Sequence, residues 1–119
     1  MEKFARYLAA VDGTNDWATI GPLFDDAIAP DCIFVTDEGE HDKTYWTGVV
    51  KGLVEKGAVA SDLEVTRQEG DVAYYHLTIT IGDDEPLDMA AKGTLRDGRL
   101  TRVEPIDPAV YSRMVERSS

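Results

Sequence analysis

The chain has 119 residues, of which 43% are hydrophobic and 29% are charged. A chain of this length forms one domain and buries roughly 65% of its unfolded surface, so residues 1–119 are expected to share a single core. Lys and Arg total 12 against 23 Asp and Glu, and the resulting net charge of -11 would repel a phosphate backbone. With no basic patch to offset this charge, the composition argues against nucleic acid as a partner.

Cysteine content and hydropathy exclude further classes. A single cysteine, Cys32, rules out an intramolecular disulfide and a cysteine-based zinc cluster. No segment approaches the roughly 18 apolar residues of a membrane-spanning helix, so we expect a cytoplasmic protein with no membrane partner. Dinucleotide-binding, P-loop, nucleophile-elbow and zinc-protease patterns are also missing from the sequence. We therefore expect no cofactor and no metal.

The first part of the chain has helical spacing. Apolar residues at i, i+3, i+4 and i+7 predict a helix over about residues 2–12. A second helix follows, capped by Thr14 or Asn15, and the pair Gly21-Pro22 is expected to kink it or divide it. The sequence thus opens with two helices.

After the second helix, the spacing of apolar residues predicts strands as well as a third helix. Residues 32–36 form a short apolar run that predicts the first strand, followed by an acidic loop. A third helix is predicted over about residues 43–56, with Gly57 at its C-terminal cap. Four antiparallel strands follow with short connections, at about residues 62–69, 72–82, 86–96 and 99–106.

Alternation along these strands indicates which side chains face the helices. In the second of the four, Tyr75 and Leu77 belong to the inward set, while Tyr74 and His76 point to the outer face. His76 is therefore expected at the surface or in a dimer contact rather than in a site.

The last hairpin has two possible registers. A two-residue turn at Asp97-Gly98 would place Arg102 on the inner face, whereas a three-residue turn would place Val103 there instead. The second register is preferred because it keeps Arg102 out of the core.

Three stretches of the sequence carry a family resemblance: residues 4–12, residues 23–35 and residues 93–100. They resemble the nuclear transport factor 2-like superfamily, in particular its SnoaL-like polyketide cyclases and ketosteroid isomerases. The resemblance implies an α+β fold, a cystatin-like cone of three N-terminal helices packed in a strongly curved mixed or antiparallel sheet. The implied order is α-α-β-α-β-β-β-β, with a homodimer formed through the outer sheet face.

The same resemblance suggests catalytic positions. Tyr7 matches the phenol that stabilises an enolate in the isomerases, although its spacing is also that of a core residue. The isomerase base falls on Thr36, which cannot serve, with Asp37 next to it, and the second oxyanion donor falls on Ala91. The cyclases use an acid near the last strand, for which Asp107 is the nearest candidate, although a strand-ending turn also accounts for it. The ketosteroid isomerase set is thus incomplete.

The leading hypothesis is a pocket for a small, largely apolar and carbonyl-bearing molecule, with cofactor-free isomerase-like or cyclase-like proton transfer as its possible chemistry. Tyr7, with Asp107 or Asp37, would provide the polar contacts. The alternative is a non-catalytic binding or dimerisation module, which a pocket below about 300 Å³ would favour. The residues expected to line the pocket are Phe24, Phe34, Thr36, Trp46, Tyr75, Leu77, Met89, Ala91 and Val103.

Overall fold

The computed structural model describes residues 2–118, which fold into four helices and one six-stranded mixed sheet. The helices are α1 (Glu2–Val11), α2 (Trp17–Ala27), α3 (Lys43–Glu55) and α4 (Pro108–Ser118). The strands are β1 (Ile28–Thr36), β2 (Gly39–His41), β3 (Ala58–Glu69), β4 (Val72–Ile81), β5 (Leu87–Arg96) and β6 (Arg99–Pro105).

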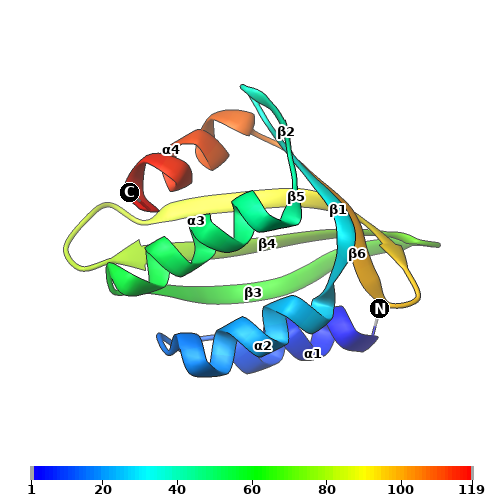
Figure 1. The fold of residues 1–119 in the computed structure, drawn as a ribbon, viewed down its shortest axis with the longest axis horizontal. Coiled ribbons are helices and arrows are strands. Elements are labelled where there is room, and N and C mark those ends of the chain that lie inside the picture. Colours follow the sequence, from blue (N-terminus) through cyan, green and yellow to red (C-terminus); the bar gives the residue numbers. More distant parts are fainter. Residues whose placement is uncertain (1, 119) are drawn as a thin grey trace.

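The sheet has the order β2-β1-β6-β5-β4-β3, in which β1 and β6 run parallel and every other pair is antiparallel. Figure 1 shows this sheet bending around α3, with α1 and α2 along the β3 side and α4 on the opposite side. The α+β class, the curved mixed sheet and the three N-terminal helices confirm the predicted fold. No helix among residues 2–118 is long and apolar enough to cross a bilayer.

The second helix shows how packing modifies local preference. It runs unbroken through Pro22, because Ile20 and Phe24 are buried on its inner face and hold both halves against the core. Its N-cap is Asp16, whose carboxylate accepts from the Ala18 N–H, rather than Thr14 or Asn15. The Asn15 amide instead donates to the carbonyl oxygens of Val54 and Ala58 and ties the loop to α3 and β3.

Two elements were not expected from the sequence. The acidic loop after β1 forms a short hairpin with β2, in which Gly39 adopts a left-handed φ of 125°. The chain also ends in α4, whose first turn is capped by Asp107, since its carboxylate accepts from the Ala109 N–H. An acidic cap before Pro108 is a helix start signal, so the sequence carried evidence for α4.

The last hairpin combines features of both predicted registers. Asp97 and Gly98 form a two-residue turn, each with positive φ, so the preferred three-residue turn was wrong. Val103 is nevertheless buried and Arg102 is not, as that register predicted. A register shift opposite Leu95 then changes the alternation of β6. As a result, both Leu100 and Val103 are buried, although an undisturbed strand would place them on opposite faces.

Candidate functional site

A cavity of about 110 Å³ lies in the cone between the helices and the inner face of the sheet. All four helices and strands β1 and β3–β6 contribute side chains to it. The lining is aliphatic and aromatic, and its polar groups are three phenols, the Trp46 indole and the hydroxyl of Thr14. The volume is below the about 300 Å³ at which ordinary small-molecule pockets begin.

The structure places most of the predicted pocket residues on this cavity. They are Tyr7, Phe24, Phe34, Trp46, Tyr75, Leu77 and Met89. Ala91 and Val103 are buried but do not line it, which corrects the expected lining. Ala91 is the cross-strand neighbour of Tyr75, and Val103 is the neighbour of Phe34, so the larger ring reaches the cavity in each pair.

The predicted carboxylates lie outside the cavity. Asp37, in the exposed turn after β1, accepts a hydrogen bond from the Ser112 hydroxyl of α4, and Asp107 is the α4 cap. Thr36 is buried, and its hydroxyl lies 3.0 Å from His41 Nε2 and accepts from the Glu38 N–H. These residues hold the β1–β2 hairpin and α4 in place, and none of them lines the cavity.

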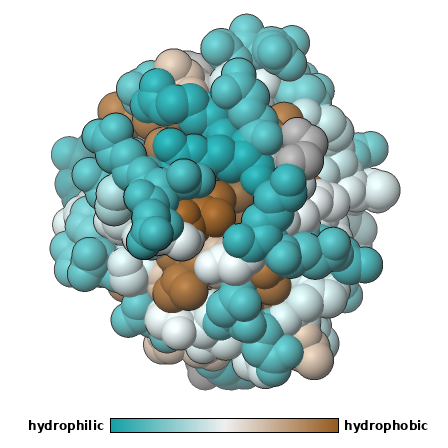
Figure 2. Space-filling view, turned by 90° about the vertical axis from the view of Figure 1, so that its left-hand side faces the viewer, coloured by the Kyte–Doolittle hydropathy of each residue, from teal (hydrophilic) through white to brown (hydrophobic). Residues whose placement is uncertain are grey.

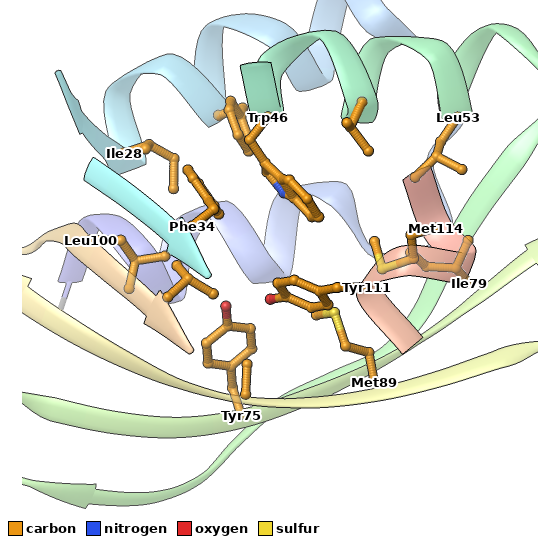
Figure 3. Close-up of a cluster of buried hydrophobic side chains, with 14 of the residues drawn as sticks. Ile28, Phe34, Trp46, Leu53, Tyr75, Ile79, Met89, Leu100, Tyr111 and Met114 are labelled. Carbon is orange, nitrogen blue, oxygen red and sulfur yellow. The ribbon is translucent and has the colours of Figure 1, made fainter. Parts of the chain in front are cut away.

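Tyr111 of α4 was missed because the helix that carries it was not expected. It is 1% exposed and lines the cavity together with Met114, one turn further along α4. Its phenol shares a side-chain hydrogen bond with the phenol of Tyr75, and Figure 3 shows the two oxygens directed toward each other. A helical period in residues 110–115 was the signal that could have found it.

Aromatic rings form a continuous stack across the site. The Phe34 and Trp46 rings are stacked with centroids 5.2 Å apart, and Trp46 and Tyr111 are stacked at 4.9 Å. On the sheet side, Phe4 packs edge-on against Tyr75 at 4.9 Å. The stack joins β1, α3 and α4, which are distant in the sequence, and such pairs add about 0.5–1.5 kcal/mol each beyond area burial.

The electrostatics of the cavity keep its phenols protonated. Desolvation raises the pKa of Tyr7 above its ordinary value of 10.0. Burial also raises the pKa of Tyr75, an effect that its hydrogen bond with Tyr111 opposes, and burial raises the pKa of Tyr111 well above its ordinary value. All three groups are therefore neutral hydrogen-bond donors at neutral pH, and none can serve as a base.

Acidic, imidazole and amine groups are missing from the cavity wall formed by the described residues. Within residues 2–118, no group of three or more His, Cys, Asp or Glu side chains is arranged to hold a metal ion. The site can therefore offer hydrogen bonds to an oxygen and apolar contact to the rest of a ligand. Its own lining supplies no general base.

One end of the molecule exposes apolar side chains. Figure 2 shows them in a hollow surrounded by hydrophilic side chains, on the side where the loop after α1 and the end of α3 lie in Figure 1. Thr14 from that loop and Val54 from the end of α3 line the cavity, so the cavity extends toward this end. The loop is held there by a hydrogen bond from the Gly13 N–H to the Ala60 carbonyl, 2.7 Å long.

No protein-family model matches the sequence, and a search of curated proteins finds no significant match. Solved structures do match. A candidate polyketide cyclase from Sinorhizobium meliloti is 24% identical, with a TM-score of 0.60 and coverage of 88% of this chain and 94% of its own.

Two further solved structures match this chain over most of its length. A protein with a cystatin-like fold from Xanthomonas campestris is 20% identical, covers 95% of each chain and has a TM-score of 0.64. An NTF2-like protein from Cytophaga hutchinsonii is 11% identical, covers 93% of this chain and 92% of its own, and has a TM-score of 0.62. At these identities the likeness establishes the fold alone, and this chain has the cystatin-like, NTF2-like fold that the sequence predicted.

Proposed function

We propose that this protein binds a small, slender and largely apolar molecule that carries one hydrogen-bond acceptor, such as a carbonyl oxygen. The observation that carries the proposal is the pair of phenols, Tyr75 and Tyr111, in a wall that is otherwise almost wholly apolar. When one phenol donates to the other, the accepting phenol keeps a proton for a ligand oxygen. The hydrogen bond between the two phenols polarises the one to the ligand, so the phenol that faces the ligand becomes a stronger donor.

The charge of the ligand follows from the same wall. No cationic group lines the cavity among the described residues, so a carboxylate or phosphate would be buried without a counterion. Burial of an unpaired charge is far more costly than burial of a carbonyl that receives one hydrogen bond. A neutral ligand is therefore proposed.

Binding, rather than acid–base turnover, is the activity that the cavity supports best. Isomerase or cyclase chemistry needs a base within hydrogen-bond reach of the carbon acid, and the two predicted carboxylates, Asp37 and Asp107, are occupied outside the cavity. The likeness to a candidate polyketide cyclase supports an oxygen-bearing apolar ligand as the class to test first.

The experiment compares cyclopentanone with cyclopentane, which has the same ring but no acceptor. Binding is measured by changes in the nuclear magnetic resonance signals of the protein and by thermal stability. A ligand at 100 times its dissociation constant stabilises the folded state by about 2.7 kcal/mol. We expect cyclopentanone to bind the native protein and to bind the variant Tyr75→Phe at least fivefold more weakly, because one of the two phenol donors is removed together with the hydrogen bond that polarises the other.

A matched control comes from the neighbouring residue. Tyr74 lies on the outer face of the same strand, so Tyr74→Phe should leave cyclopentanone binding unchanged. Equal affinity for the ketone and the hydrocarbon, or equal affinity in Tyr75→Phe and the native protein, would contradict the proposed donor.

A second candidate function is favoured by the small cavity volume of about 110 Å³. Under this reading the outer sheet face joins two copies of the chain in a homodimer. Cross-strand partners on that face carry both acidic and basic side chains, so it lacks the strong negative charge of the chain as a whole. They include Glu64, Glu69, Asp88, Glu104, Arg67, Lys92, Arg96 and Arg102.

Sedimentation equilibrium tests this second candidate, because the mass of a dimer is twice that of a monomer. The dimer should dissociate in Lys92→Glu, because the charge reversal makes the outer face around Glu104 and Asp88 acidic and two copies then repel each other. A native protein that sediments as a monomer at all concentrations would rule out the dimer and leave the ligand proposal intact.

A further inference from the structure

One aromatic ring of the cavity wall, that of Tyr111, belongs to the last helix of the chain. Tyr111 stacks on Trp46 at a centroid distance of 4.9 Å and a tilt of 28°, and its phenol bonds to that of Tyr75. Figure 3 shows the Tyr111 ring between these two side chains, in the middle of the cluster. It thus makes both contacts that a flat hydroxyaromatic ligand would make here, ring stacking and one hydrogen bond.

The size of the cavity is consistent with Tyr111 standing where such a ligand would lie. A volume of about 110 Å³ lies below the about 300–1,000 Å³ typical of sites for small molecules. Tyr111 and Met114 are the two α4 side chains that line the cavity, so withdrawal of α4 would enlarge it by the volume of both. The cone is therefore narrow because α4 fills part of it.

We propose that Tyr111 is an internal occupant of the ligand position, and that a flat hydroxylated aromatic molecule displaces it by lifting α4 from the cone. The inference rests on the proposed function, since it takes the cavity to be a ligand site. It adds that the site is held closed by the protein's own C-terminal helix.

The attachment of α4 suits release. Its buried inward side chains are Val110, Tyr111 and Met114, and the helix shares no strand ladder with the sheet. Its polar contacts to other elements include two exposed hydrogen bonds, from Ser112 to Asp37 and from Arg117 to the carbonyl of Glu85. A helix that is held by side-chain packing and exposed hydrogen bonds, with no backbone ladder to the sheet, opens at a lower free energy than a central strand.

The packing of α4 on α3 provides a way to lift it without touching the stack. Gly52 lies on α3, where an added Cβ would collide with the backbone carbonyl of Ser118 at the end of α4. Gly52→Ala would therefore push the end of α4 away, while it raises the helix propensity of α3 itself. This variant loosens α4 and keeps Tyr111 intact.

The test uses p-cresol, which is the tyrosine side chain as a free molecule, and toluene, which lacks the hydroxyl. Dissociation constants are measured for the native protein and for Tyr111→Ala, Gly52→Ala and Val110→Ala. Val110 is buried on α4 but does not line the cavity, so its variant loosens the helix, as Gly52→Ala does, without removing any of the cavity wall. All four proteins are first checked for native circular dichroism.

We expect p-cresol to bind Tyr111→Ala at least tenfold more tightly than the native protein, and more tightly than toluene binds Tyr111→Ala. Gly52→Ala and Val110→Ala should each bind p-cresol more tightly than the native protein, because α4 is already loosened in both. Equal affinities in Tyr111→Ala and the native protein would overturn the inference. If Tyr111→Ala does not fold, an unchanged affinity in Gly52→Ala would overturn it.

Hydrogen exchange provides an independent readout of displacement. Saturation of the native protein with p-cresol should speed amide exchange along α4 and leave β4 protected. Slower exchange along α4 would show that the ligand binds beneath a closed helix, which contradicts the inference. Binding of cyclopentanone, which is small enough for the closed cavity, would still support the proposed function in that case. Failure of both ligands with every variant would refute both proposals.

Discussion

Tyr74 and Tyr75 are adjacent on β4, yet the two faces of the sheet give them different environments. Tyr75 is 6% exposed, packs on Phe4 and bonds to Tyr111 inside the cone. Tyr74 is half-buried on the outer face, where the Arg67 guanidinium lies 4.3 Å from the centre of its ring. The inner face excludes water and depends on packing, whereas the outer face holds solvated pairs such as His76 and Glu64, 3.6 Å apart. Substitutions on the inner face should therefore be far more costly.

The largest effect is expected at Trp46, the centre of the aromatic stack. Trp46→Ala leaves a cavity between Phe34 and Tyr111 and should lower the free energy of unfolding by about 3–5 kcal/mol, measured by urea denaturation. Its neighbour on α3 is the control. Tyr45 is 39% exposed and stacks on His41 at the surface, so Tyr45→Ala should cost less than about 1 kcal/mol. Equal losses would mean that the stack does not organise the core.

Alkaline pH should weaken the interior before it affects the surface. Cys32 is 0% exposed, and burial, assisted by the charge of Asp31, raises its pKa from 9.0 to about 12. Because the folded-state pKa lies above the unfolded one, this contribution is complete below pH 9.0 and is lost as the pH rises toward 12. The loss per group is at most about 1.4 kcal/mol for each pH unit.

The control for this pH dependence is Cys32→Ala, studied by urea denaturation between pH 8 and pH 12. Without the thiol, the decline should begin about one pH unit later, where the buried tyrosines of ordinary pKa 10.0 begin to titrate in the unfolded chain. Identical profiles for the variant and the native protein would show that the thiol does not contribute.

A smaller effect is expected at Gly93 of β5, which lies beneath two inner side chains. A Cβ at Gly93 would come within 2.5 Å of Leu100 Cδ2 and 3.3 Å of Tyr75 Cε1. Both neighbours are buried, so Gly93→Ala should cost about 1–3 kcal/mol by overpacking. Gly48→Ala on α3, where nothing lies within 4 Å, should instead be neutral or stabilising. A neutral Gly93→Ala would show that the inner face can relax.

The smallest effect distinguishes the two tyrosines directly. Tyr75→Phe leaves the Tyr111 hydroxyl without its partner and should cost about 1–2 kcal/mol, measured as a shift of the urea midpoint. Tyr74→Phe should stay within about 0.5 kcal/mol, because its ring remains in place against Arg67. The inner hydrogen bond would be disproved by equal midpoints for the two variants.

The periodicity of apolar residues in the sequence predicted most of the helices and strands. Helical spacing predicted α1, α2 and α3 within a few residues, and the period of two predicted β4, β5 and β6. The alternation along β4 also placed Tyr75 inside and His76 outside, as the structure has them. These features depend on which side of each element is apolar, and that information is present in adjacent residues.

Tertiary structure decided the composition of the site. The register shift in β6 buries both Leu100 and Val103, and it depends on strands that meet only in the folded sheet. The placement of Asp37 and Asp107 outside the cavity depends on α4, with which both form hydrogen bonds.

The sequence by itself determined an α+β cone with an aromatic interior, because periodicity and turn residues act locally. Only the tertiary structure could pair Tyr75 with Tyr111, which lie 36 positions apart, since such a contact requires α4 to fold back over the cone. The narrow volume of the cavity has the same origin, because it is the space left after all four helices have packed against the sheet.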